Sequence, residues 1–565
     1  MNEFKIGKTI VKDPEIISNT FNNFFTNIGK NLANKIPNSD IDPLSYLQPS
    51  NNFSVAITPT TESEIIDILK KLKNSSSGYD GIDSRVIKDT YSGFTQPLVY
   101  VLNLSLLNGY FPNELKIAQI TPIHKSGENN LINNYRPVSL LSVFSKILER
   151  LMYDRVIGFI DKHNILHKCQ FGFRKKYGTS LALIHLVDKL CQALNEKKVT
   201  LGVFIDLKKA FDTVDHTILL RKLHSYGIRG IAYDWFRNYL NERKQFVYFN
   251  GTKSKETLIS CGVPQGSILG PLLFLLYVND LPNATNLFVL MFADDTNFFL
   301  SGQNENELIQ KMNDELNKLS KWLIVNKLTL NVAKTNYMFI SGQRVIDVNS
   351  NIQINGLNIS RVYSAKFLGI IIDHKLNWNE HIHYIKAKLS KSIGIICKAK
   401  KYLNNKTLLT LYYSFFQSYL IYGIEIWGST YATYSESLIV LQNRVVRIIK
   451  GVHPRTSTVN LMKELRILQL QKLYKVSVLM FMFKFVKGEL PDLFSEMYNY
   501  QADFHEYNTR NTNQFRTPFC RLDVVKMQIR YKGAEIWDLM KSSFNHNCSL
   551  YTFNRRIKKL LLKND

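Results

Sequence analysis

The sequence predicts a mixed α+β fold in which helices pack against one face of an antiparallel sheet. Residues 199–207 (VTLGVFIDL) are rich in β-branched and aromatic residues, as expected of a buried strand. Residues 287–301 contain two apolar runs separated only by Asp294 and Asp295, which is typical of a hairpin with the two acids at its tip. Residues 305–328 then place apolar side chains at helical spacing.

The first 200 residues are predicted to be largely helical. Residues 14–36 have apolar side chains at helical spacing, and a loop-like segment follows them. A second helix is expected to begin after Thr61, because Thr61 and Glu64 form a capping pattern ahead of an apolar run. Further helices are predicted at 154–166 and 181–194.

The region after the central strand mixes helices and strands before it becomes helical. Residues 214–228 predict a helix that ends near Gly227. Residues 334–341 and 365–373 indicate strands. Residues 374–450 are predicted to be helical, with one apolar stripe formed by Ile382, Ile385, Leu389, Ile393 and Ile396.

The composition favours a folded protein that binds a polyanion. The chain has 565 residues, of which 45% are hydrophobic and 21% are charged, and this argues against disorder of the whole chain. Its net charge is +26, and basic segments recur along its length. This distribution predicts a basic channel for nucleic acid rather than a basic tail, with an anionic membrane surface as the second choice.

Targeting signals are not recognised in the sequence. The six cysteines lack zinc-ligand spacing and indicate a reducing compartment. The best candidate for a membrane span, residues 267–278, is too short and is interrupted by Gly270 and Pro271. We therefore expect an intracellular protein, in the nucleus and/or the cytoplasm, with no membrane partner.

Three carboxylates are candidates for a shared metal site. Asp206 ends the predicted central strand, and Asp294 and Asp295 occupy the predicted hairpin tip. Carboxylates gathered at one point need a compensating cation, and hard oxygen ligands select Mg²⁺ or Mn²⁺. Two such ions about 3.5–4 Å apart can activate a hydroxyl and stabilise a leaving pyrophosphate. The alternative is structural, because Asp-Asp pairs are common in turns.

An ordered set of motifs resembles the reverse transcriptases of non-LTR retrotransposons, most of all the jockey-like group. FADD (292–295) is similar to their aromatic-x-Asp-Asp box, and FIDLKKAFDTVDH (204–216) to their first catalytic motif. The Pro-Gln-Gly motif lies between them in the expected order. The resemblance spans roughly residues 15–560, and its other segments are 75–82, 120–151, 170–180, 262–281, 328–340 and 366–373.

The resemblance implies a right-hand polymerase with fingers, a ferredoxin-like palm and a helical thumb. The implied domains are a helical N-terminal extension or linker (1–60), fingers (61–200), a palm (201–373), a helical thumb (374–450) and a mostly helical nucleic-acid-binding region (451–565), with 120–373 as the core reverse transcriptase domain. The endonuclease that usually precedes the polymerase in jockey-like elements is expected to be lacking.

The implied activity is RNA-directed DNA synthesis, in which a nucleotidyltransferase extends a DNA or RNA 3′-OH with dNTPs. The catalytic residues would be Asp206, Asp294 and Asp295. The two Mg²⁺ ions, or Mn²⁺ in their place, would be held by Asp206, Asp294 and the backbone carbonyl of Leu207, with Asp295 as the supporting neighbour. The implied partners are an RNA template, a DNA primer or target with a 3′-OH, and dNTPs.

Further residues are assigned to the nucleotide and the nucleic acid by the same resemblance. Phe211 would be a steric gate under the sugar, although by itself it is also typical of a core aromatic. The other nucleotide-binding residues would be Lys125, Arg136, Gln265, Gly266 and Lys334. The primer strand would be gripped by a hairpin at Phe367, Leu368 and Gly369, and thumb phosphate contacts would come from Lys386, Lys388 and Lys391.

Two other classes of protein remain open at this point. One is a catalytically inactive RNA-binding remnant of a retroelement, and the other is a relative such as a maturase or a telomerase-like enzyme. The sequence does not fix the oligomeric state, the RNA that is copied or the target site.

Overall fold

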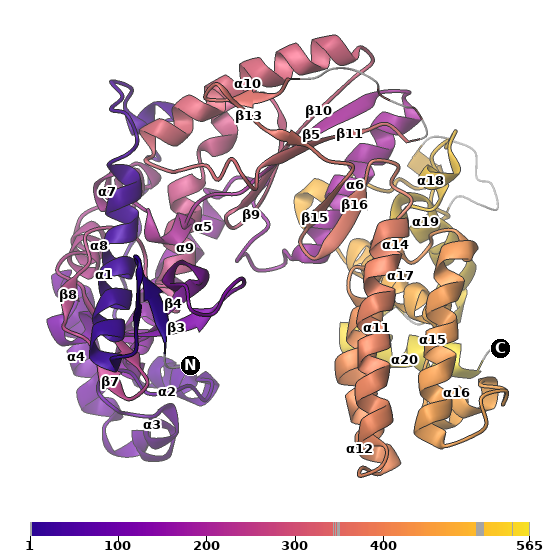
Figure 1. The fold of residues 1–565 in the computed structure, drawn as a ribbon, viewed down its shortest axis with the longest axis horizontal. Coiled ribbons are helices and arrows are strands. Elements are labelled where there is room, and N and C mark those ends of the chain that lie inside the picture. The colour runs from indigo at the N-terminus through magenta and orange to yellow at the C-terminus, as the bar shows by residue number, and fades with distance from the viewer. Residues whose placement is uncertain are drawn as a thin grey trace.

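The computed structural model describes residues 3–342, 344, 346, 351–503, 513–544 and 546–563. The chain forms an arch, with the N-terminal half in one limb, helices of the C-terminal half in the other, and a sheet across the top (Figure 1). Helix and sheet are mixed throughout, as the sequence predicts. Among the described residues, every helix is either too short or too polar to cross a lipid bilayer.

The N-terminal limb is built from helices around a sheet of order β4-β3-β6-β7, with β8 paired to β6. Its helices are α1 (Pro14–Ala33), α2 (Glu62–Lys71), α3 (Ser84–Thr90), α4 (Thr95–Asn108), α5 (Val143–Lys162), α7 (His216–Tyr226), α8 (Ile231–Leu240) and α9 (Leu269–Val278). Its strands are β3 (Ile117–His124), β4 (Tyr135–Leu140), β6 (Lys244–Phe249), β7 (Thr252–Lys253) and β8 (Thr257–Leu258), with a short N-terminal hairpin of β1 (Phe4–Ile6) and β2 (Thr9–Val11).

The helix ends follow the capping signals of the sequence. The Thr61 side chain accepts a hydrogen bond from the Glu64 amide, which confirms the predicted start of α2. Helix α7 ends at Gly227, which adopts the left-handed conformation that a helix terminus favours. The β1–β2 hairpin is not predicted by the sequence pattern, because its strands are only three residues long.

The sheet across the top has the order β14-β11-β5-β10-β9. Its strands are β5 (Val199–Ile205), β9 (Phe288–Phe292), β10 (Asp295–Gly302), β11 (Asn336–Ile340) and β14 (Ser360–Arg361). β5 is antiparallel to both β10 and β11, and β9 and β10 form the predicted hairpin. The strands predicted at 199–207 and 334–341 are therefore confirmed.

Helices cover both faces of this sheet, so the expectation of helices on one face is wrong. Helix α10 (Glu305–Val325) packs on β5 and β10, and Leu201 and Val203 belong to the core on that side. Helix α6 (Thr179–Asn195) packs on β5 and β9, and Phe204 faces its core. Every residue of β5 is buried for this reason.

Residues 365–373 form two strands rather than one. β15 (Ser364–Phe367) and β16 (Ile370–Asp373) pair as an antiparallel hairpin. The two turn residues, Leu368 and Gly369, both have positive φ, as a tight two-residue hairpin turn requires. The hairpin at 367–369 that the resemblance implies is confirmed, and the continuous strand indicated by the apolar pattern is wrong. A further small hairpin pairs β12 (Gln353–Ile354) with β13 (Leu357–Asn358).

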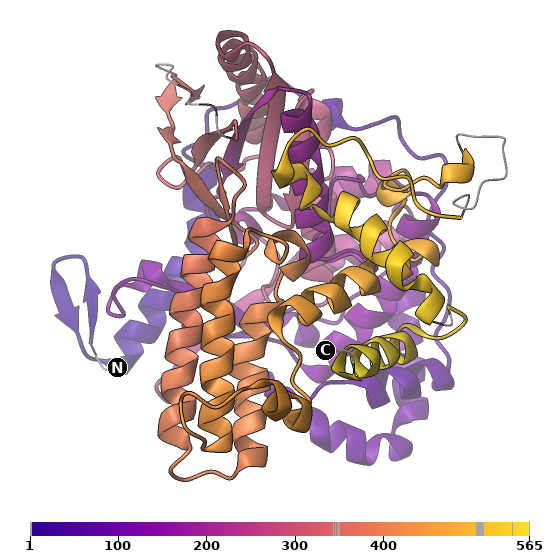
Figure 2. The same ribbon diagram turned by 90° about the vertical axis from the view of Figure 1, so that its right-hand side faces the viewer.

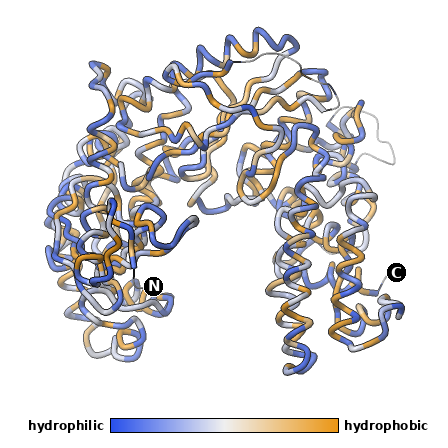
Figure 3. Tube along the Cα trace, viewed as in Figure 1, coloured by the Kyte–Doolittle hydropathy of each residue, from blue (hydrophilic) through white to orange (hydrophobic). Residues whose placement is uncertain are grey.

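The C-terminal limb is helical, as predicted for 374–450, and the predicted apolar stripe of α11 is buried. Figure 2 shows α11 and α15 side by side along this limb. Figure 3 shows apolar and polar stretches alternating along the long helices, as expected when one face is buried. The helices are α11 (Asn379–Ala399), α12 (Asn405–Leu411), a π-helical turn (Tyr412–Gln417), α13 (Ser418–Ile421), α14 (Ile424–Trp427), α15 (Ala432–Lys450), α16 (Val459–Leu465), α17 (Leu470–Val486), α18 (Asp523–Lys526), α19 (Ile529–Met540) and α20 (Leu550–Lys563).

Candidate active site

The strand register places the three predicted acids next to one another. Ile205, the last residue of β5, pairs with Thr296 of β10, so Asp206 emerges beside Asp295. Asp294 lies in the turn between β9 and β10, next to Ala293, whose φ of 56° marks a tight turn. The sequence prediction that these three carboxylates converge is therefore supported by the geometry of the sheet.

The acids repel one another in this arrangement. Burial raises the pKa of Asp294, and the nearby Asp206 raises it further. Asp295 keeps part of its surface in solvent, yet desolvation by the surrounding protein, together with Asp294 and Asp206, raises its pKa to about 6. Cationic side chains of Lys125 and Arg136 act in the opposite direction on both acids. The site thus brings three negative charges together, and the nearby cations Lys125 and Arg136 offset part of their repulsion.

Asn331 orients the first of these acids. Its side-chain amide donates to Asp206 Oδ2 at 2.6 Å, and its backbone N–H donates to the Asp206 carbonyl at 2.8 Å. The neighbouring Leu207 forms an isolated antiparallel bridge with Leu330. Sequence reasoning missed Asn331, although it lies in the same LNVAKT segment that contains Lys334.

Gln170 holds the hairpin turn that carries the other two acids. Its side-chain oxygen accepts hydrogen bonds from the Gly172 amide at 2.8 Å and the Ala293 amide at 3.0 Å. Gly172 lies so close to Ala293 that a Cβ atom would not fit there. The sequence quoted this QFGFR segment as part of the resemblance, but nothing in its pattern assigns a role to Gln170.

Four cations, Lys125, Arg136, Lys209 and Lys334, lie near one another at this site, and Lys125 and Arg136 act on the acids. Lys125 and Arg136 lie at the end of the β3–β4 hairpin, where Ile123 pairs with Arg136. Burial lowers the pKa of Lys125, Arg136 and Lys334 lower it further, and Asp206 and Asp294 oppose them. Lys209, which sequence reasoning missed, donates to the Tyr135 carbonyl at 3.1 Å.

The Pro-Gln-Gly loop is anchored to the strand that carries Arg136. The Gln265 carbonyl accepts from the Ser139 amide of β4 at 2.8 Å. Gly266, at φ +125°, passes so close to the Ser139 carbonyl that a Cβ would lie 2.6 Å from it. Glycine is required here because a side chain would collide with the β4 backbone. The loop therefore lies against the strand that carries Arg136.

Phe211 lies in the short 3₁₀ turn Ala210–Asp212 after β5. Its ring stacks on Phe274 of α9, with centroids 4.4 Å apart, and Phe173 approaches it edge-on at 6.4 Å. It is half-buried, so one part of the ring packs in the core while another part is accessible. This environment suits a ring that is held rigidly beneath a substrate.

The predicted primer-grip and thumb residues lie on a different part of the fold. The Leu368 carbonyl accepts from the Tyr422 hydroxyl at 2.6 Å, which joins the β15–β16 turn to the helical limb. Phe367 is only 3% exposed, so a contact at this hairpin would have to come from the turn itself. Of the three lysines predicted on α11, Lys386 and Lys391 are exposed and Lys388 lies over the Tyr384 ring at 5.5 Å.

The acids fit a divalent metal bound together with substrate. Among the described residues, no three His, Cys, Asp or Glu side chains are arranged to hold an ion on their own. Mg²⁺, however, characteristically binds one or two carboxylates together with substrate phosphates and waters. Asp206 and Asp294 supply the hard oxygen donors that this mode needs, and burial together with the nearby Asp206 raises the pKa of Asp294.

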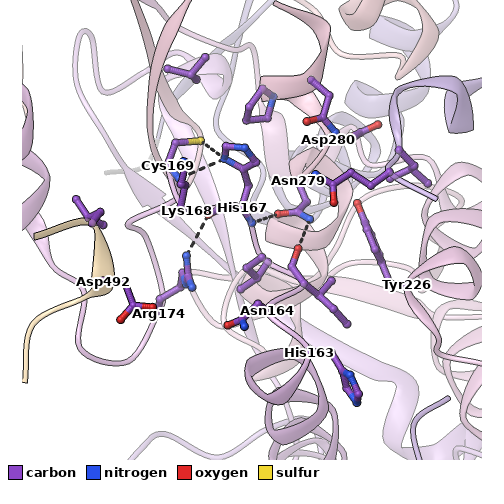
Figure 4. Close-up of a pocket in the computed structure, with 18 of the residues that line it drawn as sticks. His163, Asn164, His167, Lys168, Cys169, Arg174, Tyr226, Asn279, Asp280 and Asp492 are labelled. Atoms are coloured by element: carbon purple, nitrogen blue, oxygen red, sulfur yellow. Dashed lines mark hydrogen bonds between the residues drawn. The ribbon is translucent and has the colours of Figure 1, made fainter. Parts of the chain in front are cut away.

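A cavity lies at the other end of β9. It has a volume of about 1200 Å³, and Figure 4 shows His167, Cys169 and Arg174 in its wall. The His167 amide donates to the Asn279 side chain at 2.7 Å, and Arg174 donates to the His167 carbonyl at 3.1 Å. The acids are not among its lining residues in the described part of the chain, so this cavity is not the place where their chemistry occurs.

The central part of the chain matches a known protein family. Residues 123–372 match the family described as reverse transcriptase (RNA-dependent DNA polymerase). The matched residues contain both acid motifs.

The chain is also similar to polymerases named from mobile elements of Drosophila. In Drosophila melanogaster, the probable RNA-directed DNA polymerase from transposon BS is 30% identical over 424 residues, which cover 72% of this chain and 46% of that protein. The RNA-directed DNA polymerase from mobile element jockey is 29% identical over 75% of this chain and 47% of its own length. The probable RNA-directed DNA polymerase from transposon X-element is 28% identical over 72% of this chain and 45% of its own length. The chain spans about half the length of these relatives.

Proposed function

We propose that this chain is an RNA-directed DNA polymerase that extends a DNA or RNA 3′-OH with dNTPs by two-metal phosphoryl transfer. The observation that carries the proposal is the register of β5 with β10, which sets Asp206 beside Asp294 and Asp295. The relatives named above, which carry the name RNA-directed DNA polymerase or probable RNA-directed DNA polymerase, support the same reaction. The partners would be an RNA template, a primer or target with a 3′-OH, and dNTPs.

The acids would hold two Mg²⁺ ions through Asp206, Asp294 and the carbonyl of Leu207. When bound, such ions activate the attacking hydroxyl and neutralise the leaving pyrophosphate. Asn331 would keep the Asp206 carboxylate in its ligating orientation, through the 2.6 Å hydrogen bond. Asp295 would complete the negative site without being a principal ligand.

The cations would bind the triphosphate. Arg136 offers a planar fork for phosphate oxygens, and Lys125 and Lys209 supply point charges. Lys334 would stand near the departing pyrophosphate and could supply its proton. Phe211 would lie under the sugar and reject a 2′-hydroxyl, so that deoxyribonucleotides are preferred.

The two limbs and the sheet suggest the right-hand arrangement. The proposed fingers (61–200) include the β3–β4 hairpin, the palm (201–373) includes the sheet with the acids, and the thumb (374–450) includes α11. The proposed fingers and palm pack against each other on both sides of the boundary at residue 200. β6, in the palm range, pairs with β3, and α6, in the finger range, covers the palm sheet. Residues 451–565 would extend the nucleic-acid-binding surface.

Primer extension tests this function. Purified protein with Mg²⁺, an RNA template, a DNA primer and dNTPs is expected to extend the primer, and Asp294→Asn is expected to abolish the product. Asp314→Asn is the matched control, since Asp314 is exposed on α10. RNA binding without dNTP incorporation by the unmodified chain would overturn the proposal in favour of an inactive RNA-binding remnant.

A further inference from the structure

Asp212 contacts the proposed nucleotide-binding residue Gln265 directly. The Gln265 Nε2 donates to Asp212 Oδ1 at 2.7 Å. The other carboxylate oxygen of Asp212 is buried and has no hydrogen-bond partner among the described residues. Burying a carboxylate with only one hydrogen-bond partner lowers the stability of the fold, so we ask what Asp212 does beside the Pro-Gln-Gly loop.

The backbone of Asp212 is held tightly from several sides. Its amide donates to the Lys209 carbonyl at 2.8 Å. A Cβ at Gly262 would lie 2.9 Å from the Asp212 Cα, and Gly29 of α1 leaves no room for a Cβ beside the Asp212 carbonyl. The Cys261 thiol also points to that carbonyl, at 3.6 Å. Asp212 is therefore a fixed reference point for the side chain that it contacts.

The chemistry of this contact sets the orientation of the Gln265 amide. An ionised carboxylate only accepts hydrogen bonds, so it selects the NH₂ end of the amide and leaves the carbonyl oxygen directed elsewhere. The Gln265 backbone is already fixed by its bond from Ser139. With both ends held, the amide presents one defined pattern of donor and acceptor.

We propose that Asp212 is a positioning residue that locks the Gln265 amide in one orientation and thereby sets the affinity for the incoming dNTP. This inference rests on the proposed function. Phe211, the proposed gate under the sugar, immediately precedes Asp212, so the two neighbours would act on the same nucleotide from adjacent positions.

The charge state of Asp212 is compatible with this role. Burial raises the pKa of Asp212 to about 6, against the lowering effects of Gln265, Lys209 and Arg136. At pH 8 the carboxylate is therefore ionised and acts as an acceptor only. Asparagine at this position keeps the size but can donate as well as accept, so the lock on the amide is lost.

A double-mutant cycle tests the inference at pH 8. Asp212→Asn is expected to raise the KM for dNTP about tenfold, the worth of one hydrogen bond to a charged group, while kcat stays within about threefold. In a Gln265→Ala background the same substitution is expected to change the KM less than about twofold, because the contact no longer exists. Effects that add in the double variant would show that Asp212 acts only through the fold and would overturn the inference, as would an unchanged KM in Asp212→Asn.

Asp215→Asn is the matched control. Asp215 caps α7 through the Ile218 amide and pairs with Lys327 at 2.6 Å, so its loss should lower the melting temperature and leave the KM for dNTP unchanged. Binding of the next dNTP to a complex that contains a dideoxy-terminated primer separates the two proposals. Weakened binding in Asp212→Asn supports the inference even if the unmodified chain fails to extend primers, whereas equal binding in the two chains refutes it. Absence of dNTP binding by the unmodified chain refutes both.

Discussion

Asp280 and the acid tip, which we define as Asp206, Asp294 and Asp295, are acids of the same sheet-and-helix core whose charges are balanced differently. Asp280 follows α9 and accepts a hydrogen bond from Lys222 at 2.6 Å, and neither side chain has any exposed surface. Lys222 also donates to the Tyr277 carbonyl at 2.8 Å. The protein therefore neutralises Asp280 with its own cation.

The acid tip has no such internal partner. Among the described residues, no Lys or Arg forms an ion pair with any of its three carboxylates. Burial and like-charged neighbours raise the pKa values of Asp294 and Asp295, whereas at Asp280 the paired Lys222 opposes the rise that burial causes. Asp280 is one half of a buried ion pair, whereas the acids proposed to serve chemistry repel one another without a paired cation in the described part of the chain, as is typical of functional sites. The comparison predicts opposite outcomes for mutations in the two places.

Asp294→Asn should have the largest effect. We expect primer extension to fall about 10³-fold or more, because a metal ligand contributes several kcal/mol to the transition state. The free energy of unfolding should stay the same or rise slightly, since one repelling charge is removed. Single-turnover kinetics and denaturant unfolding measure the two quantities, and a destabilised but active variant would reverse the assignment.

Lys222→Met should have the opposite profile. It leaves Asp280 buried without its cation, which is expected to cost about 3–5 kcal/mol of stability. The fraction that remains folded should extend primers at a rate close to normal. The double variant Lys222→Met/Asp280→Leu should recover most of the stability, because an apolar pair can replace a buried ion pair. Failure of this recovery would mean that the pair does more than balance charge.

The acid tip could be predicted from the sequence because its cause is local. The apolar runs around Asp294 and Asp295 specify a hairpin, and a strand that ends at Asp206 can pair with it. The continuous apolar run of β5 also carried a signal for burial on both faces, which the expectation of helices on one face did not use. In residues 365–373, an apolar run likewise led to the prediction of one continuous strand, although the chain turns at Leu368.

The supporting contacts could not be predicted, because they join segments that are far apart in the chain. Asn331 reaches Asp206 across 125 positions, and Gln170 reaches Ala293 across 123. Neither residue type differs from an ordinary surface or loop amide until the fold brings it to an acid or a turn. The resemblance to known motifs marks the segments that contain Asn331 and Gln170, but the contacts that these two side chains make are visible only in the folded structure.

Asn331→Ala should have an intermediate effect. Groups that orient a metal ligand typically contribute 10–100-fold to metal affinity or activity. We expect a loss of activity in that range, with a higher Mg²⁺ concentration needed for half-maximal rate and no large loss of stability. A Mg²⁺ titration of the extension rate measures the concentration that gives half-maximal rate. An unchanged midpoint would show that Asn331 does not orient the metal ligand Asp206.

The pH dependence of stability should show the smallest effect. Because the pKa of Asp295 is raised from 3.8 to about 6 in the fold, the folded protein binds more protons than the unfolded chain between these values. Ionisation of Asp295 in the fold therefore lowers the free energy of unfolding. This loss of stability is absent at low pH, grows as the pH rises from about 4 to 6 and is complete above about 6. In metal-free protein, Asp295→Asn should flatten this decline, as followed by denaturant unfolding at several pH values. The same slope in both proteins would show that Asp295 is solvated normally.

The most direct test of the account is to locate the metal on the chain. Fe²⁺ substituted for Mg²⁺, in the presence of primer, template and dNTP, reduces added hydrogen peroxide to hydroxyl radicals that cleave the backbone close to the bound ion, and ascorbate returns the Fe³⁺ to Fe²⁺. We predict cleavage near residues 206 and 294 in the unmodified chain and in Asp314→Asn, and loss of both cuts in Asp206→Asn and Asp294→Asn. Cuts elsewhere, or cuts that persist in those two variants, would contradict the claim that the acid tip is the metal site of a polymerase.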